Sequence, residues 1–390
     1  MSDFVALNYI EEYDVKQIET SLRASFSSIN ACKDLKAKAK VLVLVNAPQA
    51  YSPNQANSTH PAVVSGVVNV LSEHGVNCIV AVSPYKSFSS IELDEVYIST
   101  GMLDVANSTK CELNRNLKTF NLPLNNGVAT KSVKLLDIVN QVDAIVNIGK
   151  VKVDDSLGYL GATSNLFGLI PGEYKTLMLN RLTTLKDFNN LIIDLYFGLK
   201  NKLVLNVLDG IVSLEAGKSQ RMLSCLAVAE NPFKLDASLI KILNIPYENT
   251  ILNQAEKRGL INLKYPFKLL GEGVDKFIVE DFAVCEFDEN SKIHKNESKA
   301  KAYFNRNQQR PIIKPDKCKG CKVCSKICPT GAIMMKVDKN GELYAHIDYS
   351  KCIFCFKCHT ACPYSVVDVK TPVKYKMLMK QIDKQNKTDK

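Results

Sequence analysis

Short apolar runs alternate with helical patterns over the first two thirds of the chain. The runs have the length and the β-branched content that are typical of buried strands. They cover residues 41–48, 78–84, 144–149 and 203–211, and helical spacing of apolar residues occurs at 62–74 and 188–199. Residues 1–40 are expected to form a helical lead-in. The alternation predicts an α/β N-terminal domain with a largely parallel sheet, over residues 1–285.

The predicted parallel sheet indicates where a ligand would bind. In open α/β sheets, ligands bind in the crevice beyond the carboxyl ends of the strands. The loops that follow Pro48, Pro84, Gly149 and Asp209 are therefore the expected edges of a site.

The pattern changes after residue 285. Residues 286–314 are charged, low in aliphatic side chains and without clear periodicity, which is typical of a linker. Residues 315–370 are predicted to form a small α+β module, in which Asn340-Gly341 indicates the turn of a hairpin. Residues 371–390 are predicted to be a basic surface tail.

Eight cysteines in the 315–370 module follow one repeated spacing, Cys-x2-Cys-x2-Cys-x3-Cys-Pro. This is the ligand pattern of a bacterial-type ferredoxin with two 4Fe–4S clusters, in which the fourth Cys of each run ligates the other cluster. The pattern predicts one cluster on Cys318, Cys321, Cys324 and Cys362, and a second on Cys352, Cys355, Cys358 and Cys328.

Two other uses of the cysteines fit this pattern less well. Structural zinc sites usually arrange their ligands as two separated Cys-x2-Cys pairs around one tetrahedral ion, whereas this chain has two complete four-Cys runs. A disulfide framework is expected in short secreted chains. Electron transfer is thus the chemistry that the module predicts.

Composition and charge narrow the class of protein. The chain has 390 residues, 46% of them hydrophobic, and a formal net charge of +10. Each oxidised cluster with its four thiolates carries about −2, which brings the expected net charge to about +6. The lysines are dispersed, so nucleic-acid binding is not favoured. The acidic N-terminus lacks the apolar segment of a signal peptide, and the expectation is a soluble, cytoplasmic protein without a membrane span.

Lysine is in excess around the predicted clusters. Residues 314–370 contain ten Lys and five acidic side chains. This excess would either dock an acidic electron carrier, such as a ferredoxin or flavodoxin, or offset the charge of the clusters themselves.

Several stretches of the N-terminal region resemble the family named domain of unknown function 362, which is often fused to a two-cluster ferredoxin module. The resemblance spans about residues 40–265. It rests on the stretches THPAVVSGVVNVLSEHGVNCIVAVSP (59–84), GKVKVDDSLGYLGATSNLFGLIPGEYK (149–175), LDGIVSLEAG (208–217) and NPFKLDASLIKILNIP (231–246). In the last stretch, the resemblance implies that Asp236 opens a helix.

The chain also departs from the family pattern. Family members usually carry a His where this chain has Asp154, a Lys where it has Ser164, and another His near Leu179. The acidic turn that follows the 208–217 stretch is shorter than in the family. The departures indicate either altered chemistry or a domain that serves as a scaffold.

Four residues are candidates for ligand binding. His60 precedes Pro61 at a predicted helix N-terminus, where it would either meet an anionic ligand or act as a cap. Lys150 and Lys152 follow a buried strand, where a phosphate or carboxylate could bind. Asn165 occupies a position that matches the family motif.

Three carboxylates are candidates for catalysis. Asp154, which precedes another Asp, could hold a metal or act as a base, and its alternative is ordinary turn chemistry. Asp209 and Glu215 flank a Gly turn at a strand end, where a general acid/base or a divalent ion is plausible. The alternative for both is again turn chemistry.

Two functional hypotheses follow. In the first, the protein is an oxidoreductase component that passes single electrons from a soluble carrier through two 4Fe–4S clusters to a ligand, or to a further organic cofactor, in the N-terminal domain. In the second, it is a non-catalytic electron-transfer or assembly subunit, whose N-terminal domain binds a partner such as a redox enzyme. A weaker third hypothesis is nucleic-acid modification with structural clusters.

Overall fold

The structure is a computed structural model of the whole chain. It describes residues 3–85, 88–182, 184–285, 289–291, 293, 310–328, 331–338, 340–349, 351–352 and 356–370, without the side chains at 173, 180 and 218. Two compact units are present, and each is described by itself. The first reaches residue 293, and the second holds the cysteine-rich module. The predicted tail, 371–390, and most of the predicted linker lie outside the described residues.

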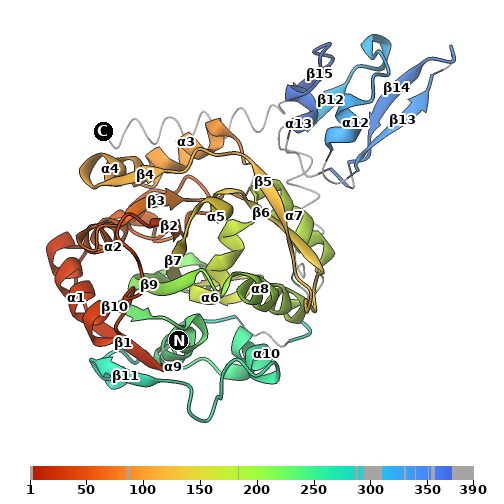
Figure 1. The fold of residues 1–390 in the computed structure, drawn as a ribbon. Coiled ribbons are helices and arrows are strands. Elements are labelled where there is room, and N and C mark those ends of the chain that lie inside the picture. The colour runs from red at the N-terminus through yellow and green to blue at the C-terminus, as the bar shows by residue number, and fades with distance from the viewer. Residues whose placement is uncertain are drawn as a thin grey trace. The chain divides into compact units, whose positions relative to one another are not determined.

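The first unit is built on one nine-stranded mixed sheet (Figure 1). Its order is β11-β1-β10-β9-β7-β2-β3-β4, and β8 pairs with β7. The bounds are β1 Phe4–Tyr9, β2 Lys40–Val45, β3 Asn77–Ala81, β4 Cys111–Leu113, β7 Ala144–Asp154, β8 Gly158–Leu160, β9 Leu203–Leu214, β10 Gln220–Ala229 and β11 Lys268–Gly271. Strands β9, β7, β2, β3 and β4 run parallel, which confirms the predicted α/β class with a largely parallel sheet.

Helices lie on both faces of the sheet, with α1 and α2 on one side and α6, α8 and α9 on the other (Figure 1). A separate hairpin consists of β5 Thr119–Pro123 and β6 Ser132–Leu136. The helices are α1 Val15–Ser28, α2 Pro61–Glu73, α3 Ser90–Ser99, α4 Met102–Ser108, α5 Ile138–Gln141, α6 Ala162–Asn165, α7 Gly172–Arg181, α8 Leu185–Leu199, α9 Pro232–Ile242 and α10 Ile251–Lys257. No helix in the described part of the chain is long and apolar enough to cross a membrane.

Local sequence explains why the central elements form. In β2, Val41–Val45 are all buried, as expected for a parallel strand that is covered on both faces. Helix α8 begins with a capping box, because Thr184 and Asp187 each accept a hydrogen bond from the other's backbone N–H. Helix α9 begins at Pro232 after the N-cap Asn231. Asp236 therefore lies inside α9, and the expectation that it opens this helix was wrong.

Three expectations about elements need correction. Residues 4–9, expected to be part of a helical lead-in, form β1 between β10 and β11. Strands β7 and β9 extend beyond Gly149 and Asp209, so these residues lie within strands and not at their ends. Residues 310–313, at the end of the predicted linker, form a strand of the second unit.

In its described residues, the second unit contains two antiparallel strand pairs and two short helices. Strand β12 (Arg310–Ile313) pairs with β15 (Val367–Lys370), and β13 (Ile333–Val337) pairs with β14 (Leu343–Ile347). The turn predicted at Asn340-Gly341 joins β13 to β14, and Gly341 has a φ of 82°. The helices are α12 Val323–Ile327 and α13 Lys357–Thr360.

Candidate functional site

A small cavity lies at the carboxyl ends of the parallel strands, at the edge that the sheet topology predicts. Its volume is about 50 Å3. Asn46 follows β2, Ser83 follows β3, and Lys150 and Lys152 come from the distal half of β7. Lys175 of α7 also lines the cavity, and the other polar lining residues are Tyr85, Ser164 and the candidate Asn165.

Lys150 forms a fully buried ion pair with Asp209 of the neighbouring strand β9. The two residues are opposite each other in the parallel register, and Lys150 Nζ lies 2.9 Å from Asp209 Oδ2. Both side chains are completely inaccessible to solvent. Burial lowers the pKa of Lys150, and the Asp209 carboxylate opposes that effect. Lys150 is the only one of the two that lines the cavity.

Tyr13 and His60 complete the surroundings of Asp209. The Tyr13 hydroxyl donates to Asp209 Oδ1 at 2.9 Å and lies 2.9 Å from Lys150 Nζ, which donates to it. The backbone N–H of His60 donates to Asp209 Oδ2, and the backbone N–H of Ile211 donates to Oδ1. Four donors thus hold the Asp209 carboxylate in one orientation.

The His60 ring stacks on the Tyr13 ring, with centroids 3.6 Å apart. His60 is the N-cap of α2, and its Nδ1 accepts a hydrogen bond from the backbone N–H of Ala62. Burial lowers the pKa of His60 to about 4. The ring is therefore neutral at physiological pH, and the capping role that the sequence offered as an alternative is the one its contacts support.

Lys152 begins a chain of hydrogen-bonded amides across the sheet. Its Nζ donates to Asn46 Oδ1 at 3.0 Å and to the carbonyl oxygen of Asn57 at 2.8 Å. Asn46 donates to Asn165 Oδ1, and Asn165 donates to Asn147 Oδ1. Because burial is the dominant effect, the pKa of Lys152 falls to about 8.

Lys175 is buried with no ion pair among the described residues. Its Nζ donates to the carbonyl oxygen of Ser83. The amine also lies 5.2 Å from the centroid of the Tyr85 ring and 6.0 Å from that of Phe167. Burial lowers the pKa of Lys175 to about 7, so that the charged and the neutral amine coexist near neutral pH.

Asp236 of α9 fixes the short helix α6 on the other wall of the cavity. Its carboxylate accepts hydrogen bonds from the backbone N–H groups of Ala162 and Thr163, from the Thr163 hydroxyl and from the Tyr159 hydroxyl. The first N–H groups of a helix have no acceptor within the helix itself, and Asp236 supplies the acceptors for those of α6. Burial raises the pKa of Asp236 to about 6.

The other two candidate carboxylates do not line the cavity, although Asp154 is close enough to Lys152 to favour its charged form. Asp154 Oδ1 accepts from the backbone N–H groups of Ser156 and Leu157, so it closes the turn between β7 and β8. Glu215 accepts from Arg221 Nε at 2.7 Å. Within the described residues, no three His, Cys, Asp or Glu side chains are arranged to hold a single metal ion. Asp154 therefore makes the contacts of a turn residue, whereas Glu215 is a buried carboxylate, 8% exposed, that pairs with Arg221.

Sequence reasoning missed five residues of this region. Two signals could have found some of them: Asn46 directly follows a clear strand, and Lys175 ends the 149–175 stretch that resembles the family. The others carry no local signal, because their roles depend on contacts with distant strands. The missed residues are Tyr13, Asn46, Asn147, Lys175 and Asn206, whose Oδ1 accepts a hydrogen bond from Asn147 Nδ2.

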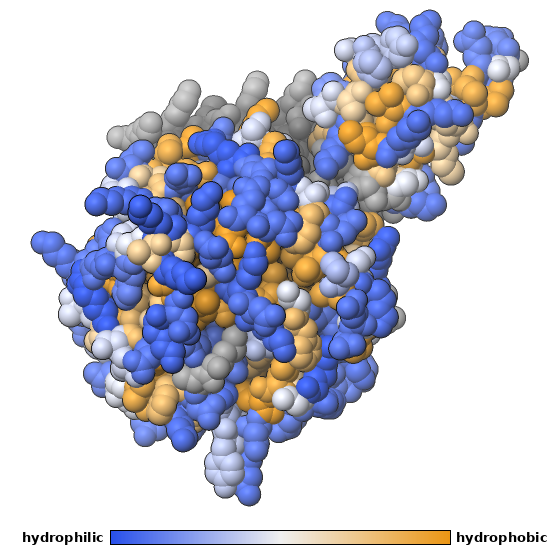
Figure 2. All heavy atoms as spheres, in the orientation of Figure 1, coloured by the Kyte–Doolittle hydropathy of each residue, from blue (hydrophilic) through white to orange (hydrophobic). Residues whose placement is uncertain are grey.

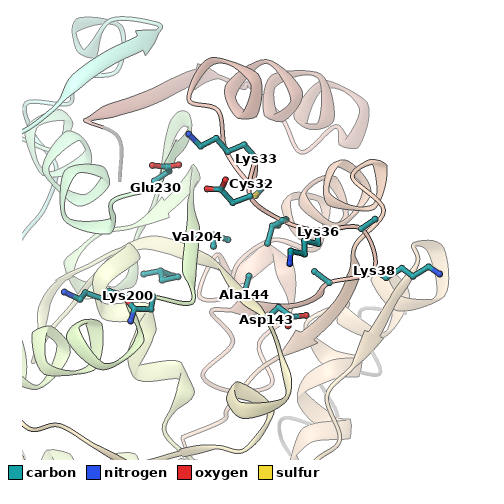
Figure 3. A pocket seen from close by; sticks show the side chains of 15 residues that line it. Cys32, Lys33, Lys36, Lys38, Asp143, Ala144, Lys200, Val204 and Glu230 are labelled. Atoms are coloured by element: carbon teal, nitrogen blue, oxygen red, sulfur yellow. The ribbon is translucent and has the colours of Figure 1, made fainter.

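A larger cavity of about 700 Å3 lies at the opposite edge, beside the amino ends of β2, β7 and β9. Figure 3 shows Lys36 and Lys38 on one side of it and Lys200 and Glu230 on the other. These lysines are exposed to solvent. Burial raises the pKa of Cys32, which also lines the cavity, to about 12, so its thiol stays protonated. The larger volume of this cavity is therefore not a sign that it is a catalytic site.

The cysteine loops of the second unit show a pseudo-twofold repeat. Lys322 follows Cys321 and begins α12, whereas Phe356 follows the second Cys of the other run and begins α13. Both residues have left-handed backbone conformations, with φ of 63° and 56°. A positive φ turns the chain back sharply, as a loop that wraps around a cluster requires.

The described cysteines fit 4Fe–4S clusters. Cys318, Cys321 and Cys324 line one cavity together with Cys362, which comes from the other run. Cys328, Cys352 and Cys358 pack against or within the apolar core that also includes Ile333 and Ile347. The backbone N–H of Ala332 donates to Cys328 Sγ at 3.3 Å, a contact that stabilises a thiolate. Cys355 lies outside the described residues.

The surface of the second unit combines apolar and basic side chains. Figure 2 shows apolar residues gathered on its visible face. Among the described residues of this unit, eight large apolar side chains are exposed: Val323, Ile327, Met334, Val337, Leu343, Tyr349, Tyr364 and Val369. Lysines lie among them in the sequence.

Gly320 makes a specific prediction about this unit. Its φ is 61°, and a Cβ added there would lie 2.8 Å from the carbonyl oxygen of Leu343. We expect Gly320→Ala to lower the iron bound per chain and the temperature at which the visible absorbance is lost, because the loop must shift away from Leu343. Gly331→Ala is the matched control, with φ of 62° and no atom within 4 Å. Equal effects of the two substitutions would refute the steric argument.

Two family models match different parts of the chain. Residues 41–241 match the family model described as domain of unknown function (DUF362), and residues 317–366 match that of the 4Fe-4S dicluster domain. An uncharacterized ferredoxin of Methanocaldococcus jannaschii is 36% identical over 59 residues, which are 15% of this chain and 75% of that protein. Subunit PorD of pyruvate synthase from the same organism is 40% identical over 58 residues, 15% of this chain and 63% of that protein. The lactate racemase apoprotein of Thermoanaerobacterium thermosaccharolyticum aligns with a TM-score of 0.37 and 13% identity, over 60% of this chain and 55% of that one.

Proposed function

Because the chain belongs to the DUF362 family and carries a 4Fe–4S dicluster ferredoxin domain, we propose that it is an iron–sulfur oxidoreductase component. It passes single electrons from a soluble carrier, such as a ferredoxin or flavodoxin, through two 4Fe–4S clusters to a ligand in the N-terminal domain. When bound, each cluster supplies one-electron transfer. The ligand site includes Lys150, Lys152 and Asn165.

One observation supports the first hypothesis over the others. Three buried lysines line the cavity at the carboxyl edge of the sheet, in the same chain as an electron-transfer domain. Burying three amines is costly, and a purely structural sheet edge has no need of them. Lys150 is fixed by Asp209 and serves as a positioning residue for the cavity wall. His60, as a neutral N-cap, holds α2 against the same carboxylate.

The ligand site can be tested on the protein as purified. The chain is isolated without oxygen and denatured, and the released small molecules are identified by mass spectrometry and by their absorption. We expect one small molecule per chain, and its loss in Lys152→Met. No released molecule, together with an unchanged visible spectrum in Lys152→Met, would overturn the proposed ligand site.

The proposed cluster ligands predict how pairs of substitutions combine. With about eight irons in the wild type, the pair Cys321→Ala and Cys362→Ala removes two ligands of one cluster. We expect about four irons to remain and the other cluster to keep an unaltered electron paramagnetic resonance signal. The pair Cys321→Ala and Cys328→Ala should alter both clusters, because each loses one ligand.

The reverse result would show that each run of four Cys binds its own cluster. In that case the Cys321 and Cys328 pair would leave one cluster intact. Cys285→Ser serves as the control, since Cys285 lies in the first unit and is only partly buried. Zinc in place of iron would overturn the proposed chemistry altogether.

A non-catalytic subunit is the second candidate function. The observation that favours it is the similarity of the ferredoxin domain to PorD, which is named as a subunit of pyruvate synthase. In this case the N-terminal domain would bind a partner redox enzyme. Stoichiometric co-purification with a larger enzyme, with no small molecule released, would favour this function over the first.

A further inference from the structure

The cavity at the carboxyl edge is positively charged and has no acidic lining residue. Its lining includes Lys150, Lys152 and Lys175, and none of the described lining residues is Asp or Glu. The charge of Lys150 is balanced by Asp209 behind the cavity wall. Lys152 and Lys175 have no ion pair among the described residues, although they are only 7% and 2% exposed. Two buried amines therefore face one cavity, and neither has an ion-paired carboxylate among the described residues.

Both amines are held by neutral oxygens that leave further N–H groups available. Lys152 Nζ donates to Asn46 and to the carbonyl oxygen of Asn57, and Lys175 Nζ donates to the carbonyl oxygen of Ser83. An ammonium group has three N–H donors. Within the described residues, one donor of Lys152 and two of Lys175 remain for a ligand. Carbonyl and amide oxygens orient an ammonium group but do not neutralise it.

We propose that the cavity binds a small oxyanion, a carboxylate or a phosphate-like group, between Lys152 and Lys175. This inference names the ligand class of the proposed site and rests on that proposal. An anion would supply the missing counter-charge and accept the remaining N–H groups. Charged pairs of this kind are strong where solvent is excluded.

The cavity volume limits the size of the ligand. A site needs about 10–15 Å3 of this measure for each water molecule, so about 50 Å3 holds roughly three to five waters. Acetate has four non-hydrogen atoms and sulfate has five, which matches this volume. Drug-sized ligands occupy cavities of about 300–1,000 Å3. A flavin or a nucleotide would therefore not fit between the two lysines, and only the anionic end of a longer ligand would enter.

Anion binding at this site is coupled to proton uptake. Burial lowers the pKa of Lys175 to about 7 and that of Lys152 to about 8, so part of the free protein carries neutral amines. The other titratable groups that face them are Lys150, which opposes the charge on Lys152, Asp154, which favours it, and Tyr85. An anion favours the protonated amines, so its affinity should fall as pH rises from about 7 to about 9.

Calorimetric titration of the full-length holoprotein tests the proposal. Sodium acetate and sodium sulfate are titrated separately, in two buffers of different ionisation enthalpy, at pH 7 and pH 9. We expect one site per chain, at least tenfold weaker binding at pH 9, and net proton uptake with acetate. The stronger of the two probes separates a planar carboxylate site from a tetrahedral one. No binding of either probe at millimolar concentration overturns the proposal.

Substitutions locate the site. Lys175→Met and Lys152→Met should each weaken binding at least tenfold, whereas Lys200→Met, at the opposite edge of the sheet, should leave it unchanged. If a variant fails to fold, as judged by near-ultraviolet circular dichroism, acetic anhydride labelling of the wild type replaces it. Acetate or sulfate should protect Lys175 from acetylation, and unprotected labelling would overturn the proposal.

The result is separable from the proposed function as a whole. If an oxyanion binds but no electron reaches a ligand in the first unit, this inference stands and the oxidoreductase proposal fails. If the double-cysteine variants behave as expected but no anion binds, this inference alone fails.

Discussion

Asp209→Asn should lower the free energy of unfolding of the first unit by about 3–5 kcal/mol, the cost of leaving one member of a buried ion pair uncompensated. Lys150 would then be a buried cation that faces an amide, and both side chains are completely inaccessible. For a unit of this size, the loss corresponds to a fall of about 10 °C in the unfolding midpoint. Near-ultraviolet circular dichroism follows this unit, while the visible absorbance follows the second.

The pH dependence of this deficit has a definite sign. The folded-state pKa of Lys150 lies below its ordinary value of 10.5, and loss of Asp209 lowers it further. Above pH 10.5 the amine is neutral in both the folded and the unfolded chain, and the penalty for burying its charge vanishes. The deficit of Asp209→Asn should therefore shrink between pH 7 and pH 10.

Two further variants make the explanation falsifiable. Adding Lys150→Met to Asp209→Asn removes both charges and should restore much of the lost stability. Asp281→Asn breaks an exposed pair with Arg221 and should change the unfolding free energy by less than about 1 kcal/mol. If Asp209→Asn behaves like Asp281→Asn, the Lys150–Asp209 pair does not carry buried charges.

The edge of the sheet where the cavity lies could be predicted from the sequence, because the signal is local. Buried strands such as 41–45 are continuous apolar runs, and the carboxyl ends of parallel strands meet at one edge. Lys150 and Lys152 follow such a run directly, so their place at this edge was expected. The extension of β7 through both lysines was not expected, since two charged residues usually indicate the end of a buried strand.

The partners of these lysines could not be predicted, because each depends on a distant contact. Tyr13 lies in a region expected to be helical, and it reaches Asp209 because β1 pairs with β10, more than 200 residues away in the chain. No periodicity or spacing in the sequence predicts this strand pairing. Lys175 is separated from Ser83 by 92 residues. Its low exposure is a property of the packed fold and not of its neighbours in the chain.

For the ferredoxin domain, the sequence predicts the chemistry well and the backbone conformation poorly. A cluster fixes the chemistry of its ligands so strongly that the Cys spacing identifies the domain without any knowledge of packing. The backbone details are less visible. Phe356 adopts a φ of 56°, a conformation that a bulky residue rarely takes, and the position is explained only by its equivalence to Lys322 in the other loop.

Asp236→Asn should be the second strongly destabilising substitution, with an expected loss of about 2–4 kcal/mol at pH 5. The wild-type carboxyl group faces four hydrogen-bond donors, two of which are backbone N–H groups at the N-terminus of α6. An asparagine places an amide N–H2 group against these donors, so that one or two of them are left buried without an acceptor. Because Ser164 and Asn165 of α6 line the cavity, oxyanion binding should weaken as well.

The difference between wild type and Asp236→Asn should decrease as pH rises. The pKa of Asp236 is raised from 3.8 in the unfolded chain to about 6 in the folded protein, because burial disfavours the charged form. The folded state therefore binds a proton more tightly, and the wild type loses stability between about pH 4 and pH 6. A shift of two units corresponds to about 3 kcal/mol at most. Asparagine does not titrate, so unfolding midpoints of both proteins at pH 5 and pH 7 isolate the effect.

A stability difference that grows with pH would show that burial does not set the charge of Asp236. If the four donors outweigh burial, the carboxylate stays ionised in the folded protein, and the advantage of the wild type over Asp236→Asn grows with pH. Asp137→Asn is the control, since Asp137 is a partly exposed carboxylate whose pKa is lowered by hydrogen bonds from Gln141 and Asn140. Its contribution is lost as pH falls, so its slope should be opposite in sign to that of Asp236. The comparison thus decides whether burial or hydrogen bonding sets the charge of the residue that holds α6 against the cavity.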